Sequence, residues 1–328
     1  MKGASILDIV DVKKHYTVRR SFLSSGVKEI VKAIDGVSLQ IFPGETLGLV
    51  GESGCGKSTM GSCIMGLQGV TSGSISFGEE EKKDIVHMTE KERFTYSEKV
   101  QIVFQDPYSA LNPQKTILSS LDEPMKVHGI TNKQERLDRI AHLLESVNLK
   151  ADYMYRYPHE FSGGQLQRIC IARSLSVNPM MLICYEPVSA LDVSIQAQVL
   201  NLLMDIQQKM GLTYLFIAHD LSVVYHMSDR IAVMYLGKIM ETTVSSDLYA
   251  HPRHPYTQAL LSAIPSPDLD YHPKRVILKG DVPSPSDIPS GCRFHKRCQE
   301  CKDICGQEEP QLKDYGNGHL VACHFPAR

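Results

Sequence analysis

A nine-residue stretch, GESGCGKST at residues 51–59, constrains this chain more than any other part of it. It fits the pattern G-x-x-x-x-G-K-[ST], in which backbone N–H groups cradle phosphates, a lysine reaches the β- and γ-phosphates and a hydroxyl binds Mg²⁺. The apolar run 46–50 predicts a buried strand before the loop, and residues 58–67 predict a helix after it. We therefore expect a nucleotide site built from Gly51, Ser53, Gly54, Cys55, Gly56, Lys57, Ser58 and Thr59, with Ser58 on Mg²⁺.

A second motif lies about a hundred residues downstream, where residues 161–168 read FSGGQLQR. A serine hydroxyl and glycine amides at the start of a helix can contact a γ-phosphate. The two motifs in this order resemble those of ATP-binding cassette (ABC) ATPases. In that family the second motif, the signature motif, contacts the nucleotide held by the other subunit of a head-to-tail dimer. The resemblance assigns this contact to Ser162, Gly163, Gly164 and Gln165.

The resemblance also implies roles for residues outside these two motifs. In VFQDPYSALNP, Gln105 corresponds to the Q-loop glutamine, which contributes to catalysis and to the Mg²⁺ site. In YEPVSALD, Glu186 corresponds to the catalytic glutamate, and Asp192 ends the D-loop. His219 in LFIAHD corresponds to the switch histidine, and Tyr16 in KKHY to the aromatic residue that stacks on adenine.

One position departs from the family pattern. An intact cassette carries an acidic residue at the end of the Walker B strand, but residues 181–186 read MLICYE and place Tyr185 there. A phenol is neutral near pH 7, whereas Mg²⁺ favours hard, anionic oxygens. Two interpretations stay open. In the first, Mg²⁺ is held well enough by Ser58, Gln105 and phosphate oxygens, or by another carboxylate. In the second, this site binds ATP but hydrolyses it poorly, while the intact signature motif contacts the nucleotide of a partner.

Length and apolar patterning indicate the fold class. A chain of 328 residues exceeds one ordinary domain and predicts a main domain of about 250 residues with an appendage. Short alternating runs over 5–50 predict an antiparallel sheet, and three- and four-residue spacing over 116–176 predicts helices. The apolar runs 180–184 and 213–218 have the length of strands in a parallel sheet. The charged and weakly patterned stretch 79–99 predicts a surface connection.

The resemblance covers about residues 5–328 and implies an α/β architecture. We expect a P-loop NTPase core with an antiparallel β-subdomain, an inserted helical subdomain at about 106–176 and a Cys-rich C-terminal extension. After His251 the chain becomes rich in Pro and His, which marks a boundary. We therefore expect an ATP-binding domain over 1–250 and a regulatory or metal-binding extension over 251–328.

Charge and hydropathy exclude several functions and locations. The net charge is -2, from 35 Lys+Arg and 37 Asp+Glu, and without a long basic run it gives a nucleic-acid partner no electrostatic support. No segment approaches 18 consecutive apolar residues, and the N-terminus is charged too early for a signal peptide. We therefore expect a peripheral protein on the cytoplasmic side of the membrane, where nine cysteines would not form a disulfide framework.

The tail narrows the subfamily. HPYTQALLSAIP at 254–265 and the Cys-rich end resemble the C-terminal region of ATPase subunits from oligopeptide and dipeptide importers, with nickel importers as relatives. The insertion at 18–32 resembles the F-type rather than the D-type subunit. This implies a heterodimer with a second ABC ATPase, two membrane permeases and an extracellular substrate-binding protein. The alternatives are a non-catalytic, nucleotide-sensing subunit, or a soluble cassette protein of translation or DNA repair, although those usually carry two cassettes or a long coiled coil.

Five cysteines lie within 32 residues of the tail. Thiolates at this density suit zinc or a [4Fe-4S] cluster, and free thiols are the third possibility. The importer subunits with this tail carry an iron–sulfur cluster, and their pattern matches Cys292, Cys298, Cys305 and Cys323, which leaves Cys301 as an extra thiol. His295 and His324 are more typical of neighbours of a metal site than of ligands.

Overall fold

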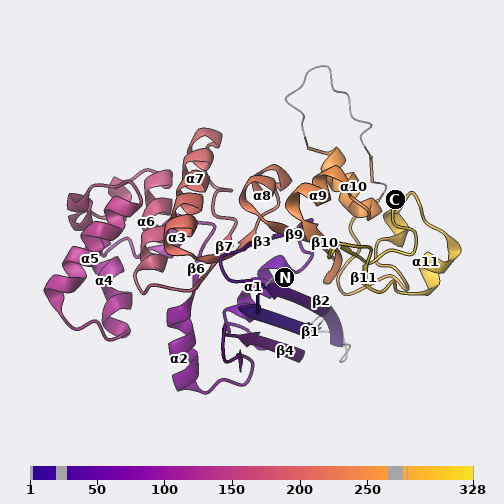
Figure 1. Ribbon diagram of the computed structural model, residues 1–328, viewed down its shortest axis with the longest axis horizontal. Coiled ribbons are helices and arrows are strands. Elements are labelled where there is room, and N and C mark those ends of the chain that lie inside the picture. Colours follow the sequence, from indigo (N-terminus) through magenta and orange to yellow (C-terminus); the bar gives the residue numbers. More distant parts are fainter. Residues whose placement is uncertain (1–2, 20–27, 265–275, 279, 328) are drawn as a thin grey trace. The chain divides into compact units, whose positions relative to one another are not determined.

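The computed structural model describes residues 3–19, 28–264, 276–278 and 280–327 (Figure 1). The chain divides into two compact units that are each discontinuous in sequence. Unit 1 comprises Met1–Ile41, Thr46–Val86 and Ala218–Arg328, and unit 2 comprises Phe42–Glu45 and His87–Ile217.

The first sheet of unit 1 is antiparallel and has the strand order β2-β1-β4-β5. Its inward positions alternate along the strands, and Ile9, Val12 and Ile75 are among the buried side chains. This confirms the antiparallel sheet predicted from the alternating pattern. The strands are β1 (Leu7–Arg19), β2 (Lys28–Ile41), β4 (Ser72–Phe77) and β5 (Lys83–Asp84).

Unit 1 also holds five strands in the order β11-β12-β10-β9-β3, in which β3 is parallel to β9 and the remaining pairs are antiparallel. The tail thus adds strands β11 and β12 beside β10. The strands are β3 (Thr46–Val50), β9 (Arg230–Tyr235), β10 (Lys238–Val244), β11 (Lys313–Asp314) and β12 (Leu320–Val321). The helices are α1 (Lys57–Ile64), α8 (Leu221–Met227), α9 (Ser245–Ala250), α10 (Pro255–Ser262), η3 (His295–Arg297) and α11 (Asp303–Gln307).

Unit 2 combines three parallel strands, in the order β8-β7-β6, with helices. The strands are β6 (Val100–Val103), β7 (Met181–Tyr185) and β8 (Thr213–Ile217). The helices are α2 (Glu90–Lys99), α3 (Pro107–Ala110), α4 (Ile117–Val127), α5 (Lys133–Ser146), η1 (Ala151–Tyr155), η2 (Pro158–Glu160), α6 (Gly163–Leu175) and α7 (Val193–Met210).

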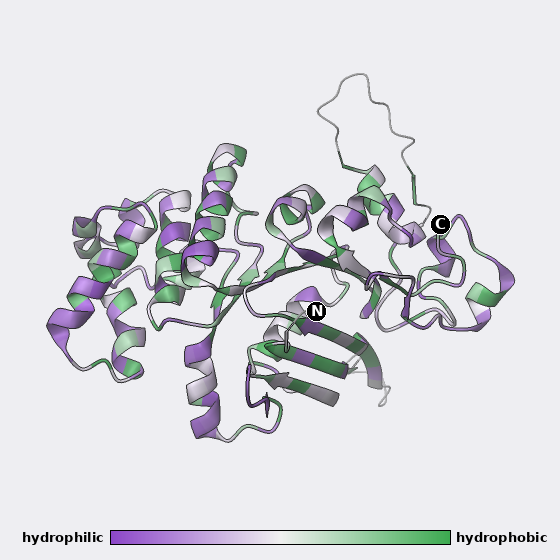
Figure 2. Cartoon of the chain, viewed as in Figure 1, coloured by the Kyte–Doolittle hydropathy of each residue, from purple (hydrophilic) through white to green (hydrophobic). Residues whose placement is uncertain are grey.

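The helices over 116–176 form as predicted from apolar spacing. In and just after α5, Ile140, Leu143, Leu144 and Val147 are all buried, and the helices of unit 2 carry both hydrophobic and hydrophilic turns in Figure 2. A buried Arg136 in α5 donates from Nε to the Asp122 carboxylate of α4 at 2.5 Å. Apolar burial and this ion pair therefore fix α4 against α5.

Residues 79–99, predicted as a surface connection, include the helix α2 (Glu90–Lys99), which the sequence analysis did not predict. Thr89 caps this helix: its hydroxyl accepts from the Glu92 N–H, and the Glu92 carboxylate accepts from the Thr89 N–H. Tyr96 is the buried residue of α2. A capping box and one aromatic anchor stabilise a helix whose weak amphipathic pattern gave no signal.

Parts of two segments used in the sequence analysis lie outside the described residues. Of the insertion at 18–32, residues 20–27 are not described, and neither are residues 265–275 of the tail.

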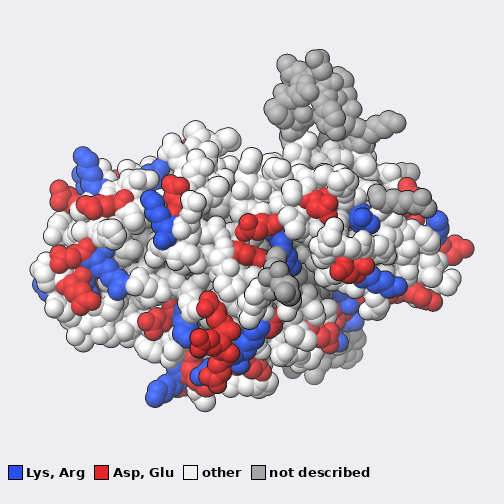
Figure 3. Space-filling view, in the orientation of Figure 1, with Lys and Arg blue, Asp and Glu red and all other residues white. Residues whose placement is uncertain are grey.

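Within the described residues, the helices are too short or too polar to cross a bilayer. On the face shown in Figure 3, basic and acidic side chains are interspersed.

Candidate functional site

The glycine-rich loop joins β3 to α1 within unit 1, as the sequence predicts. Gly51 and Gly56 have φ values of 150° and 111°. A Cβ at Gly51 would lie 2.1 Å from the Met234 carbonyl oxygen, and one at Gly56 would lie 2.2 Å from that of Ala33. Only glycine fits at these two positions, because both the backbone conformation and the space exclude a side chain.

Lys57 is the first residue of α1 and is buried. Its Nζ donates to the carbonyl oxygens of Gly51 at 2.6 Å and Glu52 at 3.1 Å, and it lies 3.7 Å from the Cys55 sulfur. The ammonium group therefore lies over the loop, at the N-terminal end of a helix, where phosphate groups bind favourably. Cys55 is also buried, and burial raises the pKa of its thiol.

The glycines of this loop make a matched pair for a stability test. Gly54 also has a positive φ, of 78°, but a Cβ there would meet nothing within 4 Å. We expect Gly54→Ala to lower the free energy of unfolding by about 1 kcal/mol, from backbone strain alone. Gly56→Ala should lower it by about 3 kcal/mol or more, because a clash adds to the strain. Urea unfolding of both variants measures this, and equal losses would contradict the loop geometry.

Two residues of the C-terminal tail contact Glu52, the second residue of the loop. The sequence analysis did not predict this contact. The Arg297 guanidinium donates to both oxygens of the Glu52 carboxylate, at 2.6 and 3.1 Å. The Glu52 N–H donates to the Tyr256 hydroxyl at 2.9 Å. No local pattern signals this contact, because Glu52 and Arg297 are 245 residues apart in sequence.

Two further predicted residues, Tyr16 and His219, belong to unit 1. Tyr16 is half-buried on β1, donates its hydroxyl to the Gln68 side chain and has the Lys14 ammonium 4.9 Å from its ring centroid. His219 is exposed just before α8, where Asp220 accepts from the Ser222 N–H at 2.8 Å and caps the helix. The cap fixes the backbone that carries His219.

The signature motif caps α6 in unit 2. The Ser162 hydroxyl accepts from the Gln165 N–H at 3.4 Å, while the Gln165 side chain accepts from the Ser162 N–H at 3.0 Å. A Cβ at Gly164 would lie 2.4 Å from Cγ2 of Ile195 in α7. The start of α6 therefore presents N–H groups and a hydroxyl next to a closely packed neighbouring helix.

The segment of Gln105 is tied to the same helix. The Gln167 side chain of α6 donates to the Phe104 carbonyl at 3.2 Å, and Arg173 donates to the Ala110 carbonyl at 2.5 Å. Gln105 itself is exposed. Unit 2 therefore links the Q-loop segment to the signature helix through α6.

Glu186 follows β7 in a strained conformation. Its φ is 42°, a left-handed value that costs a non-glycine residue about 1–2 kcal/mol, and its N–H donates to the Ile217 carbonyl at 2.8 Å. Tyr185 is the last residue of β7 and pairs with Ile217 of β8. Backbone strain of this kind is common at functional sites. Asp192 is exposed at the N-cap of α7.

Four of the five tail cysteines line one small pocket in unit 1, together with His254, Phe294, His295 and Phe325 among others. They are Cys292, Cys298, Cys305 and Cys323. Cys301 is exposed and is not among the lining residues. Burial raises the pKa of Cys292, Cys298 and Cys323 to about 11. Within the described residues, no group of three or more His, Cys, Asp or Glu side chains is arranged to hold a single metal ion.

Three further cysteines lie in the core. Cys63, Cys170 and Cys184 are buried, and burial raises the pKa of Cys170 and Cys184 to about 12. Unit 1 therefore contains the phosphate loop, Tyr16, His219 and the tail cysteines. Unit 2 contains Gln105, the signature motif, Glu186 and Asp192.

Two family models match the chain. One, described as ABC transporter, matches residues 34–189. The other, described as the C-terminal region of oligopeptide/dipeptide transporters, matches residues 240–305. The first match includes the phosphate loop and the signature motif, and the second includes three of the four pocket cysteines.

Solved structures share the cassette fold. The dimeric ATP-binding cassette MJ0796, in a post-hydrolysis state bound to ADP and Pi, is 27% identical with a TM-score of 0.63, over 73% of this chain and 98% of that one. CbiO1 from Clostridium perfringens, part of the ABC transporter complex cbiONQ, is 25% identical with a TM-score of 0.63, over 75% of this chain and 91% of that one. The chain therefore has the ABC ATPase fold predicted from its motifs.

Curated relatives match along almost the whole chain. The putative oligopeptide transport ATP-binding protein YkfD of Bacillus subtilis is 51% identical, over 99% of this chain and 97% of that protein. AppF, an oligopeptide transport ATP-binding protein of the same species, is 50% identical over 98% and 97%. DppF, the dipeptide transport ATP-binding protein of Escherichia coli, is 46% identical over 97% and 93%. With the cassette fold and the two family matches, these identities show that the chain belongs to the family of ATP-binding subunits of oligopeptide and dipeptide ABC transporters.

Proposed function

We propose that this chain is the F-type ATP-binding subunit of a peptide importer and acts as a heterodimer with a second ABC ATPase. The observation that carries the proposal is the near full-length similarity, tail included, to proteins named for oligopeptide and dipeptide transport. The heterodimer binds two membrane permeases on the cytoplasmic face and is served by an extracellular substrate-binding protein. The names of AppF and DppF favour the F-type assignment.

We assign the residues of unit 1 to nucleotide binding. Lys57 and the loop amides, from Gly51 to Thr59, bind the phosphates, and Tyr16 stacks on adenine. Ser58 holds Mg²⁺, which neutralises the charge that develops on the phosphates when it is bound. Two observations support these roles: the glycine conformations that bring the backbone to the ligand, and the buried lysine that lies over the loop.

We assign the residues of unit 2 to hydrolysis and to the partner's nucleotide. Glu186 positions the attacking water, with Gln105 at the Mg²⁺ and His219 of unit 1 at the γ-phosphate. Ser162, Gly163, Gly164, Gln165 and Asp192 act at the site of the other subunit. The support is the capped start of α6 and the left-handed Glu186, which together resemble pre-organised sites.

The hydrolytic site of this chain is degenerate in our proposal. Tyr185 ends β7 at the position where the family carries the Mg²⁺ carboxylate, and a neutral phenol is a poor substitute for it. Phosphoryl transfer depends on positioning and charge stabilisation, so loss of this carboxylate slows hydrolysis more than it weakens ATP binding. Transport would then depend on one hydrolytic site per heterodimer.

Reconstitution tests the transport function. The chain, the second ATPase and the two permeases are purified together and inserted into proteoliposomes with the substrate-binding protein. We expect peptide-stimulated ATP hydrolysis and peptide uptake that are both lost when this chain is omitted. Uptake of nickel but not of peptides would show that the transported substrate is nickel rather than peptides. Uptake that continues while the Lys57→Ala chain binds no ATP would indicate that this chain does not energise transport.

We further propose a [4Fe-4S] cluster bound by Cys292, Cys298, Cys305 and Cys323. The support is that these four thiols, and not Cys301, line one pocket. A cluster binds each cysteine to a different iron, so its ligands stand farther apart than those of a single ion. The same four cysteines are the cluster ligands that the resemblance implies, and zinc is the alternative metal for such a set.

The cluster prediction has a control within the same segment. Protein purified without oxygen should be brown and contain about four irons per chain. Cys298→Ser should bleach the colour and make the tail more sensitive to proteases, because a small segment relies on its metal for stability, while ATP binding persists. Cys301→Ser should keep both colour and iron. Stoichiometric zinc without iron would assign a zinc site instead, and absence of both metals would leave free thiols.

The domain boundaries are also part of the proposal. We place the ATP-binding domain at 1–250, its helical subdomain at about 106–176 and the tail extension at 251–328. The tail match at 240–305 supports a distinct C-terminal region. Limited proteolysis should cut near residue 250 and yield two fragments of the proposed lengths if the extension is a separate domain.

A further inference from the structure

The contact between Glu52 and the tail has the geometry of a clamp. Two guanidinium nitrogens of Arg297 donate to the two carboxylate oxygens of Glu52, at 2.6 and 3.1 Å. The Tyr256 hydroxyl accepts from the Glu52 N–H at 2.9 Å. Side chain and backbone of one loop residue are thus held by two residues of the tail. Bidentate arginine–carboxylate pairs are among the stronger hydrogen-bonded contacts in proteins.

The clamp lies against an aromatic cluster, with its arginine buried and its carboxylate partly exposed. The Arg297 side chain is 8% exposed and that of Glu52 is 26% exposed. Tyr256 packs against Tyr235 with ring centroids 4.7 Å apart, and Phe294 lies 5.3 Å from Tyr256 and 5.4 Å from Tyr235. The Glu52 carboxylate raises the pKa of Arg297 above its usual range. A pair with this burial has a defined geometry and is costly to break.

The same loop residue contacts the phosphate-binding lysine. The carbonyl oxygens of Gly51 and Glu52 accept from Lys57 Nζ at 2.6 and 3.1 Å. The peptide groups on either side of Glu52 therefore connect the tail to Lys57. A change in the tail that releases Glu52 would change the backbone on which the lysine rests.

We propose that Arg297, assisted by the Tyr256 hydroxyl, is a positioning residue for the phosphate loop, so that the tail sets the ATP affinity of this subunit. Arg297 touches neither phosphate nor Mg²⁺ in this proposal and acts through Glu52. It immediately precedes Cys298, so the pocket cysteines and the phosphate loop are joined by one short segment, η3. The proposal requires ATP binding, which the family shows, and does not depend on the degenerate site or on the identity of the metal.

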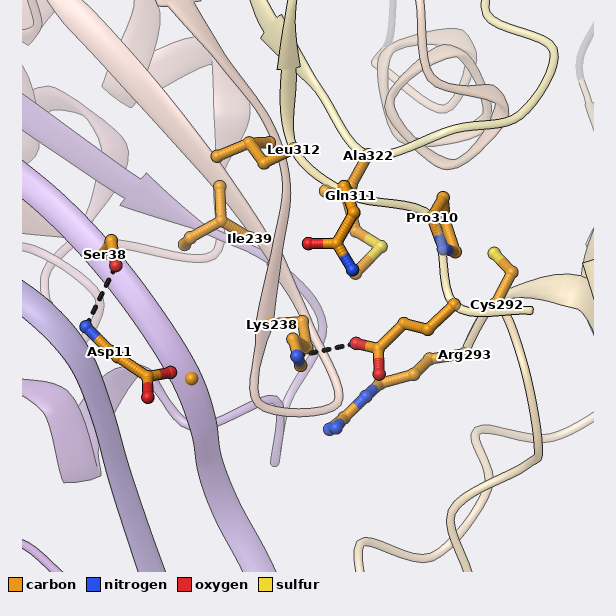
Figure 4. Close-up of a pocket in the computed structure, with 13 residues that line it drawn as sticks. Asp11, Ser38, Lys238, Ile239, Cys292, Arg293, Pro310, Gln311, Leu312 and Ala322 are labelled. Atoms are coloured by element: carbon orange, nitrogen blue, oxygen red, sulfur yellow. Dashed lines mark hydrogen bonds and ion pairs between the residues drawn. The ribbon is translucent and has the colours of Figure 1, made fainter. Parts of the chain in front are cut away.

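The chain offers a matched control, Arg293. It is also buried, with 4% of its side chain exposed, and it lies in the same segment, just after Cys292. Its guanidinium donates to Asp35 on β2 and to the Leu236 carbonyl, not to the loop. Figure 4 shows the Arg293 and Cys292 side chains pointing apart, with Lys238 nearby. Loss of Arg293 removes a comparable tail contact without touching Glu52.

The test measures the affinity of the full-length chain for ATP with Mg²⁺, by calorimetry under anaerobic conditions. Arg297→Gln should weaken ATP binding by about tenfold or more, the loss expected for charged hydrogen bonds, and Arg297→Lys should recover part of it. Tyr256→Phe keeps the ring in its cluster and should weaken binding by about threefold. Arg293→Gln should stay within about twofold of the unaltered chain.

The rate at which a protease cuts the tail, with and without ATP, is a second measurement. It remains informative even if a variant loosens the tail. Coupling between two sites is reciprocal, so ATP should slow proteolysis of the tail in the unaltered chain and in Arg293→Gln. ATP should not slow it in Arg297→Gln. Equal loss of ATP affinity in the two arginine variants would overturn the proposal in favour of a general effect of the tail. Unchanged affinity in both Arg297→Gln and Tyr256→Phe would also overturn it.

Discussion

Replacing Tyr185 with Asp is expected to raise ATP turnover at this chain's own site by about 10- to 100-fold, the usual effect of a group that supports a metal. The new carboxylate would follow Cys184 at the end of β7, directly before Glu186. It restores an anionic oxygen where the family carries one, and it removes a bulky ring from that position. Steady-state hydrolysis by the purified chain, with and without the second ATPase, measures the effect.

Tyr185→Phe is the control for this result. It removes the phenol oxygen and keeps the ring, so turnover should remain as low as in the unaltered chain if the missing carboxylate is the cause. ATP affinity should change little in either variant, because Lys57 and the loop amides remain. An unaltered chain that already turns over ATP at about 1 s⁻¹ or faster would show that the site is not degenerate.

Gly164→Asp in this chain is expected to abolish hydrolysis at the partner's site. The carboxylate would lie at the start of α6, where our proposal places the γ-phosphate of the other subunit, and like charges would repel there. Nucleotide binding at this chain's own phosphate loop should remain nearly intact, since the Lys57 ammonium is held by carbonyl groups of the loop itself. Single-turnover hydrolysis with the heterodimer, and ATP titration of the isolated chain, measure the two effects.

The structure shows why this experiment needs Gly164→Ala beside it. Any Cβ at residue 164 would approach Cγ2 of Ile195 to 2.4 Å, so part of the loss comes from packing between α6 and α7. The alanine variant carries the same Cβ without charge and should keep measurable hydrolysis at the partner's site. Equal loss in both variants would assign the effect to packing. Loss of nucleotide binding at this chain's own loop would contradict a signature motif that serves the partner.

Strands, turns and helices that depend on residues close together in the sequence were predicted well. The run 46–50 forms β3, and the loop after it needs glycine at 51 and 56 because the chain must turn where a Cβ has no room. The apolar spacing around Ile140 forms α5, because burial of one face is a local, periodic property. Helix α2 was missed because a capping box and the single buried residue Tyr96 replace the periodic pattern.

In the candidate site, too, some features depend on residues close together in the sequence and others on tertiary packing. The sequence by itself determined the phosphate loop, the capped signature helix and the position of Tyr185, since each depends on residues within a few positions of one another. The resemblance named the four cysteines of the tail, and the tertiary structure brings them to one pocket and leaves Cys301 exposed, because spacing alone does not say where a side chain points. Only the tertiary structure joined Glu52 to Arg297, since a buried ion pair between residues 245 positions apart depends on how the tail packs, which no local pattern encodes.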